Sequence, residues 1–210
     1  TSAIDILVDV SLTLHKNQSI AIVGPSGSGK TTLLNLIAGY DEITQGQLSL
    51  FGHSLLGTTE TQKAQIRGSR LGFVFQDFQL LPALTALENI TYLLTMHQID
   101  DPQSRAQSWL EKVGLIERQH HRPDQLSGGE CQRVAIARAF ALGAELILAD
   151  EPTGNLDMIA KDNVINLFFE LQQQEQVSMV VVTHDMALAK RCDQMLRLSK
   201  GTLCPIEREL

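Results

Sequence analysis

Residues 19–32 read SIAIVGPSGSGKTT, and this stretch decides the fold. Its first five residues form a short apolar run rich in β-formers. The rest fills the pattern G-x-x-x-x-G-K-[ST] with Gly24, Gly29, Lys30 and Thr31. A simple Gly/Ser turn before a helix is the alternative interpretation. The strand before the pattern and the helix after it favour a phosphate-binding loop.

The residue types of this loop suit a nucleoside triphosphate. Glycines let the backbone wrap around phosphates with its N–H groups pointing inward, and the helix that starts there adds the positive end of its dipole. Lys30 supplies a point charge for the β- and γ-phosphates, and the Thr31 hydroxyl is a hard oxygen ligand for Mg²⁺. The sequence therefore predicts ATP and Mg²⁺ as the bound groups.

A second acidic motif, ELILADE, occupies residues 145–151. Asp150 ends an apolar strand and Glu151 follows it. In parallel sheets, ligands bind outside the carboxyl ends of strands, where the phosphate loop also lies. We expect Asp150 to hold Mg²⁺ through water, and Glu151 to orient or deprotonate the water that attacks the γ-phosphate. Two solvated acids at a strand end are the alternative, which the nearby phosphate loop disfavours.

The rest of the chain alternates short strands with helices, which predicts an α/β fold with a mostly parallel sheet. From residue 77 to about 143 the pattern is helical throughout, which indicates an inserted helical subdomain. Alternation in residues 1–15 predicts a β-hairpin or antiparallel edge. Helices are expected to start near Gly29, Met158 and Met186, and strands are expected at 19–23, 47–51, 71–75, 145–149 and 178–182.

Composition excludes several other classes. A chain of 210 residues with 43% hydrophobic and 20% charged residues is one ordinary globular domain. The net charge of −7 disfavours a large nucleic-acid footprint. Three widely spaced cysteines predict a reducing, cytosolic setting without disulfides or zinc. No apolar run is long enough for a membrane-spanning helix, and no signal sequence is evident.

The motif that separates families of ATPases is LSGGE at residues 126–130. Ser127, Gly128 and Gly129 open a helix and offer backbone donors for a second phosphate contact. One phosphate loop already serves one nucleotide. A second cradle, nearly a hundred residues away, makes sense if it meets a nucleotide held by another subunit.

Together these motifs resemble those of the ABC-type ATPases, the nucleotide-binding subunits of ATP-driven transporters, over essentially the whole chain. The resemblance implies a single nucleotide-binding domain over residues 1–210, with a core at 1–76 and 144–210. It adds Gln76 of GFVFQ as a sensor of Mg²⁺ or of the attacking water, and His184 of VVTHD as a contact to the γ-phosphate. It implies catalytic roles for Glu151, His184 and Gln76 and metal contacts by Thr31, Gln76 and Asp150. The implied nucleotide-binding residues are Gly24, Pro25, Ser26, Gly27, Ser28, Gly29, Lys30, Thr31, Thr32, Ser127, Gly128, Gly129 and Asp157.

The family resemblance also implies partners and a location. Two copies would sandwich two ATP molecules head to tail and drive an integral-membrane permease from the cytoplasmic face of a bacterial inner membrane. The subgroup most similar in finer detail contains the lipoprotein-releasing and macrolide-export ATPases, which implies export or mechanical transmission. The strings that carry this likeness are FQLLPALTALENI (78–90), RPDQLSGGE (122–130), LADEPTGNLD (148–157) and KRCDQMLRL (190–198).

One departure from the family pattern concerns adenine. The family stacks the base on an aromatic residue before the first strands, whereas the first aromatic residue here is Tyr40. Either that residue lies upstream of Thr1, or apolar side chains alone hold the base.

Two other functions remain as alternatives: a soluble, non-transport ABC ATPase of DNA maintenance, and a non-hydrolysing regulatory subunit. Acidic charge disfavours the first, and the presence of Glu151 and His184 disfavours the second.

Overall fold

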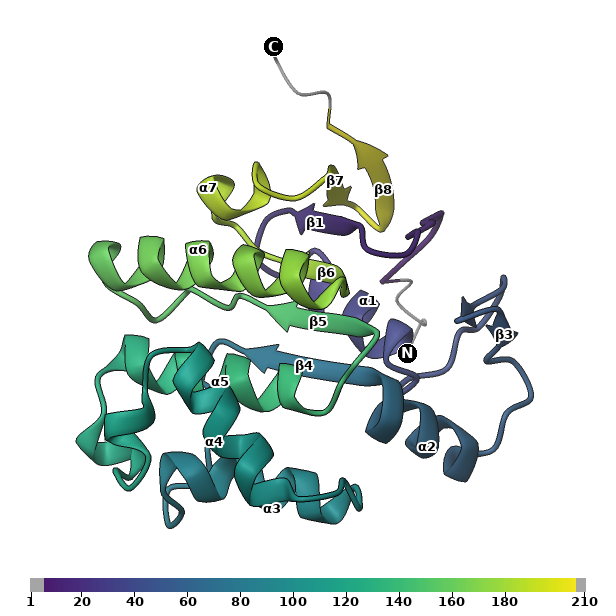
Figure 1. The fold of residues 1–210 in the computed structure, drawn as a ribbon. Helices are drawn as coiled ribbons and strands as arrows, with labels where there is room; N and C mark the ends of the chain where they lie inside the picture. The colour runs from purple at the N-terminus through teal and green to yellow at the C-terminus, as the bar shows by residue number, and fades with distance from the viewer. Residues whose placement is uncertain (1–5, 207–210) are drawn as a thin grey trace.

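The computed structural model describes residues 6–206, and a six-stranded sheet forms its centre (Figure 1). The strand order is β4-β5-β6-β1-β7-β8, and all neighbours are parallel except the antiparallel pair β7–β8. The mostly parallel sheet predicted from the sequence is therefore confirmed. The strand bounds are β1 Ser19–Val23, β4 Leu71–Phe75, β5 Leu146–Asp150, β6 Ser178–Val182, β7 Gln194–Ser199 and β8 Thr202–Pro205.

Each parallel strand carries apolar residues on both faces because both faces are covered. Ala21 and Met179 face one hydrophobic cluster, to which α5 and α6 contribute, while Ile20 and Val180 face a second cluster, to which α1 contributes. The helix bounds are α1 Lys30–Ile37, α2 Glu60–Arg70, α3 Ala86–Met96, α4 Pro102–Lys112, α5 Gly128–Ala141, α6 Met158–Glu175 and α7 Met186–Ala189, with 3₁₀ turns at Ile116–Arg118 and Pro123–Gln125.

The inserted helical subdomain is confirmed. In the described chain, residues 77–143 contain α3, α4, both 3₁₀ turns and α5, without a strand, and these helices lie together below β4 in the view of Figure 1. Their starts are encoded locally. Thr85 and Ser127 each form a capping box with the glutamate three residues later, and Asp101 caps α4 ahead of Pro102.

Two predictions near the N-terminus need correction. The strand expected at 47–51 is cut to β2 (Ser49–Leu50), which pairs antiparallel with β3 (His53–Ser54), because Phe51 and Gly52 adopt left-handed backbone angles that turn the chain. The small antiparallel sheet thus lies at 49–54. The hairpin or edge expected at 1–15 is absent from its described part, residues 6–15, where the recorded pairing is one isolated parallel bridge between Asp9 and Thr202; residues 1–5 lie outside the described chain.

The alternation of apolar and polar residues at 10–14 nevertheless has a physical cause. Val10, Leu12 and Leu14 are partly buried and pack against the cluster under α1, while Ser11 and Thr13 are exposed. The alternation of apolar and polar residues therefore arises because one side of an extended segment is buried. It does not arise from a hydrogen-bonded strand.

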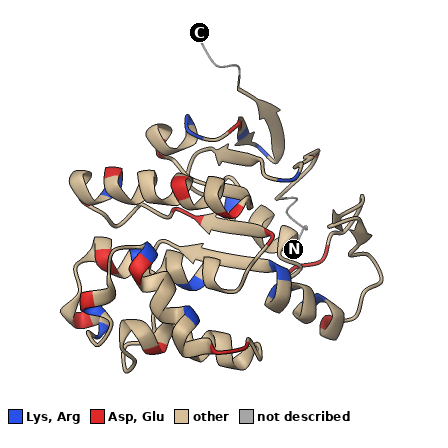
Figure 2. Cartoon of the chain, viewed as in Figure 1, with Lys and Arg blue, Asp and Glu red and all other residues tan. Residues whose placement is uncertain are grey.

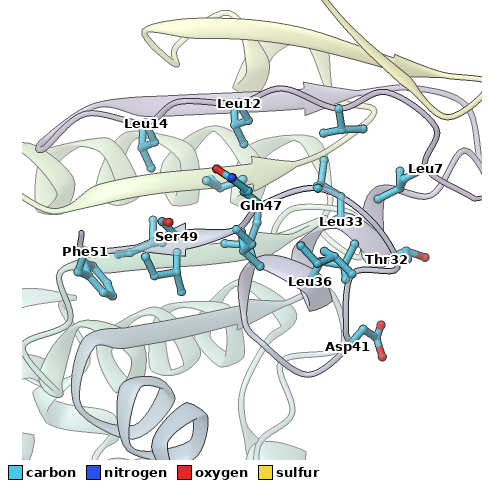
Figure 3. A pocket seen from close by; sticks show the side chains of 18 of the residues that line it. Leu7, Leu12, Leu14, Thr32, Leu33, Leu36, Asp41, Gln47, Ser49 and Phe51 are labelled. Atoms are coloured by element: carbon cyan, nitrogen blue, oxygen red, sulfur yellow. The ribbon is translucent and has the colours of Figure 1, made fainter. Parts of the chain in front are cut away.

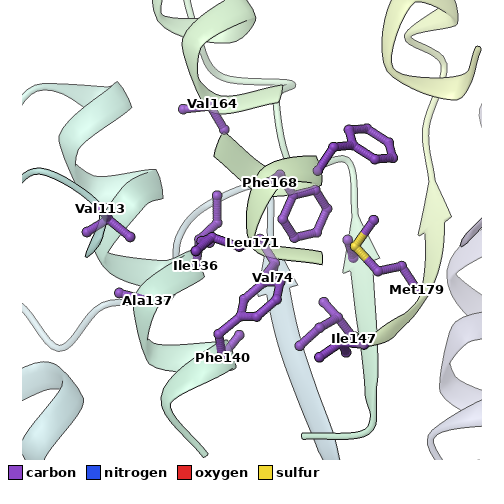
Figure 4. Packing of buried hydrophobic residues seen from close by; sticks show 14 of the residues in the cluster. Val74, Val113, Ile136, Ala137, Phe140, Ile147, Val164, Phe168, Leu171 and Met179 are labelled. Carbon is purple, nitrogen blue, oxygen red and sulfur yellow. The ribbon is translucent and has the colours of Figure 1, made fainter. Parts of the chain in front are cut away.

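Aromatic rings connect the helical subdomain to the sheet core. Trp109 of α4 packs on Phe140 of α5 with ring centroids 5.9 Å apart, and Phe140 meets Phe168 of α6 edge to face at 6.0 Å. Figure 4 shows Phe140 and Phe168 among Val74, Ile147 and Met179. Phe168 is buried, and its neighbours come from helices as well as strands.

Phe168→Ala is expected to lower the free energy of unfolding by about 3–5 kcal/mol, since it leaves a cavity where α6 meets the sheet. Urea denaturation measures this. Met158→Ala, on the same helix but with the side chain 80% exposed, should change stability by less than about 0.5 kcal/mol. Equal effects of the two substitutions would contradict this packing.

Candidate functional site

The predicted chemical groups meet at one edge of the sheet. Phe75, Asp150, Val182 and Ile22 occupy one row of the parallel register across β4, β5, β6 and β1. The residues that follow this row therefore emerge at the same carboxyl edge. They are Gln76 after β4, Glu151 after β5, Thr183 and His184 after β6, and the loop at 24–29 after β1.

The loop at 24–29 wraps around its own lysine. Lys30 Nζ donates hydrogen bonds to the carbonyl oxygens of Gly24 and Pro25, both at 3.0 Å. Glycine is required at two positions for different reasons. Gly29 has φ 96°, a left-handed value, and a Cβ on Gly24 would lie 2.3 Å from the Leu198 carbonyl oxygen. The two hydrogen bonds hold the lysine ammonium against the backbone of the loop.

The same loop fits a phosphate group. Ser28 Oγ is buried and has no hydrogen-bond partner among the described residues. Helix α1 begins at Lys30, and its N-cap residue, Gly29, supplies no side-chain cap to the first turn. Unsatisfied donors and a positive helix end are the features that bind phosphate oxygens.

Two hard oxygen atoms converge beside Lys30. The Thr31 hydroxyl donates to Asp150 Oδ2 at 2.9 Å, across 119 residues of chain. Burial raises the pKa of the Asp150 carboxyl, and the neighbouring Glu151 acts in the same direction, while the Thr31 hydrogen bond and the Lys30 charge oppose them. A hydroxyl and a carboxylate at this spacing match the ligand preference of Mg²⁺.

Glu151 is anchored by the turn that follows β6. Its Oε2 accepts the Thr183 hydroxyl at 3.0 Å, and its two carboxylate oxygens accept the His184 backbone N–H at 3.1 and 3.2 Å. His184 Nδ1 lies 2.9 Å from Glu151 Oε1. Glu151 itself has φ 47°, a left-handed backbone angle that is rare for a residue other than glycine. The predicted general base and the predicted phosphate-sensing histidine are therefore in direct contact.

Gln76 contacts the segment that follows β5. Its Nε2 donates to Asn155 Oδ1 at 3.0 Å, and Asn155 Nδ2 donates to the Gln76 carbonyl oxygen at 3.0 Å. A Cβ on Gly154 would lie 2.8 Å from Gln76 Nε2. The glutamine at the end of β4 thus packs closely on the loop behind Asp150 and Glu151.

The signature residues form a separate group at the start of α5. Ser127 Oγ accepts the Glu130 N–H at 3.2 Å, and the Ser127 N–H in turn holds the pKa of the Glu130 carboxyl below its usual value. A Cβ on Gly129 would lie 3.0 Å from that of Ala160 in α6, whose N–H is capped by Asp157 at 2.9 Å. Within residues 6–206, no hydrogen bond or ion pair joins this group to the phosphate loop.

A large cavity of about 1240 Å³ begins beside the phosphate loop, where Leu7 and Thr32 line it (Figure 3). Apolar side chains such as Leu12, Leu14 and Leu36 line it, and its floor includes Leu146 and Ser178 at the amino ends of β5 and β6. It therefore extends from the phosphate loop to the amino ends of these strands.

The aromatic residue nearest the loop in sequence does not serve the site. Tyr40 follows α1, where its ring packs on Phe73 at 5.8 Å and under the Arg67 guanidinium at 4.6 Å. Apolar residues do reach the phosphate loop. A Cβ on Gly29 would lie 2.9 Å from Ile6 Cγ2 and 3.3 Å from Leu7 Cδ2.

The sequence analysis missed two polar residues of this edge. Thr183 is fully buried and donates to Glu151, and Lys161 of α6 pairs with Asp185 at 2.9 Å. A threonine that directly follows an apolar strand was the available signal for the first. Lys161 offers no sequence signal, since its partner lies on a different element.

A parallel sheet with a phosphate loop and strand-end carboxylates at its carboxyl edge defines a P-loop nucleoside triphosphatase. A family model described as "ABC transporter" matches residues 7–154. The chain belongs to the ABC transporter family, as an ATP-binding subunit with an ABC ATPase fold.

Curated relatives are similar over nearly the full length. The uncharacterized ABC transporter ATP-binding protein YbbA of Escherichia coli (strain K12) is 45% identical over 202 residues, which cover 95% of this chain and 89% of the relative. The lipoprotein-releasing system ATP-binding protein LolD of Legionella pneumophila (strain Lens) is 45% identical over 205 residues, covering 97% and 90%. The likeness to the subgroup that contains the lipoprotein-releasing ATPases, which the finer strings imply, is confirmed.

Solved structures show the same fold. The dimeric post-hydrolysis structure of the ATP-binding cassette MJ0796, bound to ADP and Pi, has a TM-score of 0.84 at 36% identity and covers 98% of this chain and 90% of that one. A second dimeric structure of MJ0796, a bacterial ABC transporter cassette, also has a TM-score of 0.84, at 37% identity with 97% and 89% coverage.

Proposed function

We propose that the residues at the carboxyl edge hydrolyse ATP with Mg²⁺ in the roles that the sequence analysis assigns. The observation that carries this proposal is the convergence of the phosphate loop, Asp150, Glu151 and His184 at the carboxyl edge of the sheet. Lys30 and Ser28 bind phosphate oxygens, together with the backbone of residues 24–32. Thr31, Asp150 and Gln76 would hold Mg²⁺, which would neutralise phosphate charge when bound.

The protein groups then supply orientation and proton transfer. The Glu151 carboxylate accepts a proton from the attacking water, and Thr183 and the His184 N–H hold that carboxylate in position. His184 exchanges its contact with Glu151 for one with the γ-phosphate. Lys30 remains on the phosphate oxygens as charge develops, which lowers the barrier electrostatically.

Asp150→Asn is expected to raise the Mg²⁺ concentration for half-maximal ATPase activity about 10- to 100-fold, since it removes the charge that orients the metal's water. A magnesium titration at saturating ATP measures it. Asp162→Asn, on the exposed face of α6, is the matched control and should leave the titration unchanged. A shift shared by both variants would remove Asp150 from the metal site.

A second copy completes the site in this proposal. Ser127, Gly128, Gly129 and Asp157 lie apart from the phosphate loop of their own chain, and the signature helix presents unused donors at its start. We propose that Ser127, Gly128 and Gly129 bind the γ-phosphate held by the other copy in a head-to-tail dimer, with Asp157 close to that nucleotide. The dimeric structures of MJ0796 support this arrangement.

The base of the nucleotide needs an apolar surface. We propose that Ile6 and Leu7, which pack beside Gly29, supply this surface in place of an aromatic residue.

We further propose that the chain acts as a single nucleotide-binding domain, with a core at 1–76 and 144–210 and the helical subdomain at 77–143.

We also propose a permease partner. No helix of the described chain is long and apolar enough to cross a membrane. We propose that this chain works on the cytoplasmic face of a bacterial inner membrane and that integral-membrane subunits carry out the membrane step. LolD is named for a lipoprotein-releasing system, which supports export or mechanical transmission as the type of work.

Pull-down from native membranes tests the partner. The Glu151→Gln variant with ATP and Mg²⁺ should retain a polytopic permease, whereas the same variant with ADP should not. Recovery of the soluble dimer alone, under both conditions, would contradict a permease partner.

The alternative of DNA maintenance has a direct test. Acidic and basic residues are interspersed along the helices in the view of Figure 2, and the net charge is −7. A gel shift with duplex DNA at two salt concentrations should show no specific complex. Tight binding that weakens steeply with salt would favour this alternative over transport.

A further inference from the structure

The chain leaves β4 through a strained turn two residues after Gln76. Phe78 and Gln79 are consecutive left-handed residues, with φ 61° and 46°. The Gln79 N–H donates to the Asp77 carbonyl oxygen at 2.6 Å, which closes a three-residue γ-turn centred on Phe78. A γ-turn with positive φ is rare and strained, and a bulky residue there persists only where its surroundings hold it.

One partly buried arginine, Arg138, holds both strained residues. Arg138 Nη1 donates to the Gln79 carbonyl oxygen at 2.5 Å, and Nη2 donates to the Phe78 carbonyl oxygen at 2.9 Å. Among residues 6–206, Arg138 forms no ion pair, and burial lowers the pKa of its guanidinium. The two carbonyl groups are therefore the polar partners of a partly desolvated charge, and separating them from Arg138 is unfavourable.

Arg138 lies on α5, the helix that the signature glycines open. It stands ten residues after Gly128, within one uninterrupted helix. The turn it grips is covalently tied to Gln76, whose side chain reaches Asn155. A rigid helix thus connects the signature motif, through Arg138, to the glutamine at the end of β4.

We propose that Arg138 is a positioning residue that couples the orientation of the signature helix to the placement of Gln76. This inference rests on the proposed function, because it assumes that Gln76 acts on Mg²⁺ or on the attacking water. When the signature motif moves against a second copy, Arg138 carries the turn, and with it Gln76, along with α5. A guanidinium suits this task, since its planar fork grips two carbonyl groups at once.

The test is a double-mutant cycle between Arg138 and Gln76. Arg138→Met is expected to lower kcat about 10- to 100-fold, with the ATP Kd changed by less than about threefold, because positioning and not nucleotide binding is lost. Gln76→Ala should lower kcat by a similar factor. The double variant should be no slower than the slower single variant. Arg138→Lys, which keeps a charged donor, should fall between wild type and Arg138→Met.

Arg105→Met is the matched control for lost stability. Arg105 Nε donates to the Ala141 carbonyl oxygen at 2.6 Å, so the variant also removes an arginine-to-carbonyl contact of α5, at the end remote from Gly128. Its kcat should stay within about twofold of wild type. If Arg138→Met unfolds, the Arg138→Lys variant carries the same cycle.

The possible outcomes distinguish the coupling through Arg138 from the proposed ATPase function. Multiplicative losses in the double variant, or a loss in Arg138→Met equal to that in Arg105→Met, would overturn the coupling. Full activity of Gln76→Ala alongside a slow Arg138→Met would do the same. Absence of ATP hydrolysis in the wild-type chain would contradict the proposed function itself, a result distinct from either.

Discussion

Glu151→Gln is expected to lower kcat for ATP hydrolysis by about 10²- to 10⁴-fold, the usual contribution of a positioned general base. Glutamine keeps the size of the side chain and can still accept from Thr183 and the His184 N–H. It cannot take a proton from water. ATP affinity should therefore stay within a few-fold, and the variant should accumulate as a dimer when ATP is present.

Steady-state phosphate release and light scattering after gel filtration measure the two effects. Glu145→Gln is the matched control, because Glu145 stands at the opposite end of the same strand region and pairs with Arg70 at 2.5 Å. That variant should keep full activity. Hydrolysis by Glu151→Gln at the wild-type rate would mean that Glu151 is not the base.

Lys30→Ala is expected to abolish measurable turnover and to weaken ATP binding about 10- to 100-fold. The ammonium donates to the Gly24 and Pro25 carbonyl oxygens, so it lies within the loop that we propose binds the phosphates. A charged hydrogen bond is worth about 1.5–3 kcal/mol, which sets the binding loss. Turnover falls further because the same charge stabilises the transition state.

Equilibrium titration with a fluorescent ATP analogue measures the binding loss. Lys190→Ala, at an exposed position after α7, controls for loss of positive charge and should bind normally. Unchanged affinity and turnover in Lys30→Ala would show that the loop at 24–32 does not bind the phosphates.

Local patterns predicted the parts of this site that depend on one element. Apolar runs that end in Asp150 or precede His184 indicate strands buried on both faces, and the loop at 24–32 carries its own signature. The contact between Glu151 and His184 could not be predicted, because it depends on β5 and β6 being neighbours in the sheet. Sheet order is set by long-range packing, which no local pattern encodes.

The missed and misplaced elements have physical reasons. Helix α2 was not predicted because it is polar: its buried residue is Lys63, and apolar residues do not recur at helical spacing. The capping box of Thr59 and Gln62 was the one sequence feature that indicated a helix there. At 1–15 the alternation was real but reflected burial without pairing. Strands β7 and β8 were not predicted, although Met195, Leu196 and Leu198 of β7 are buried.

The central claim is that each ATP site is shared between two copies, and mixing two inactive variants tests it most directly. Lys30→Ala lacks the phosphate-binding charge, and Ser127→Arg lacks the signature contact. In a mixed dimer, one site combines an intact Lys30 with an intact Ser127. The account predicts that an equal mixture recovers up to about a quarter of wild-type ATPase activity. A mixture no more active than the two variants measured separately would contradict the shared site.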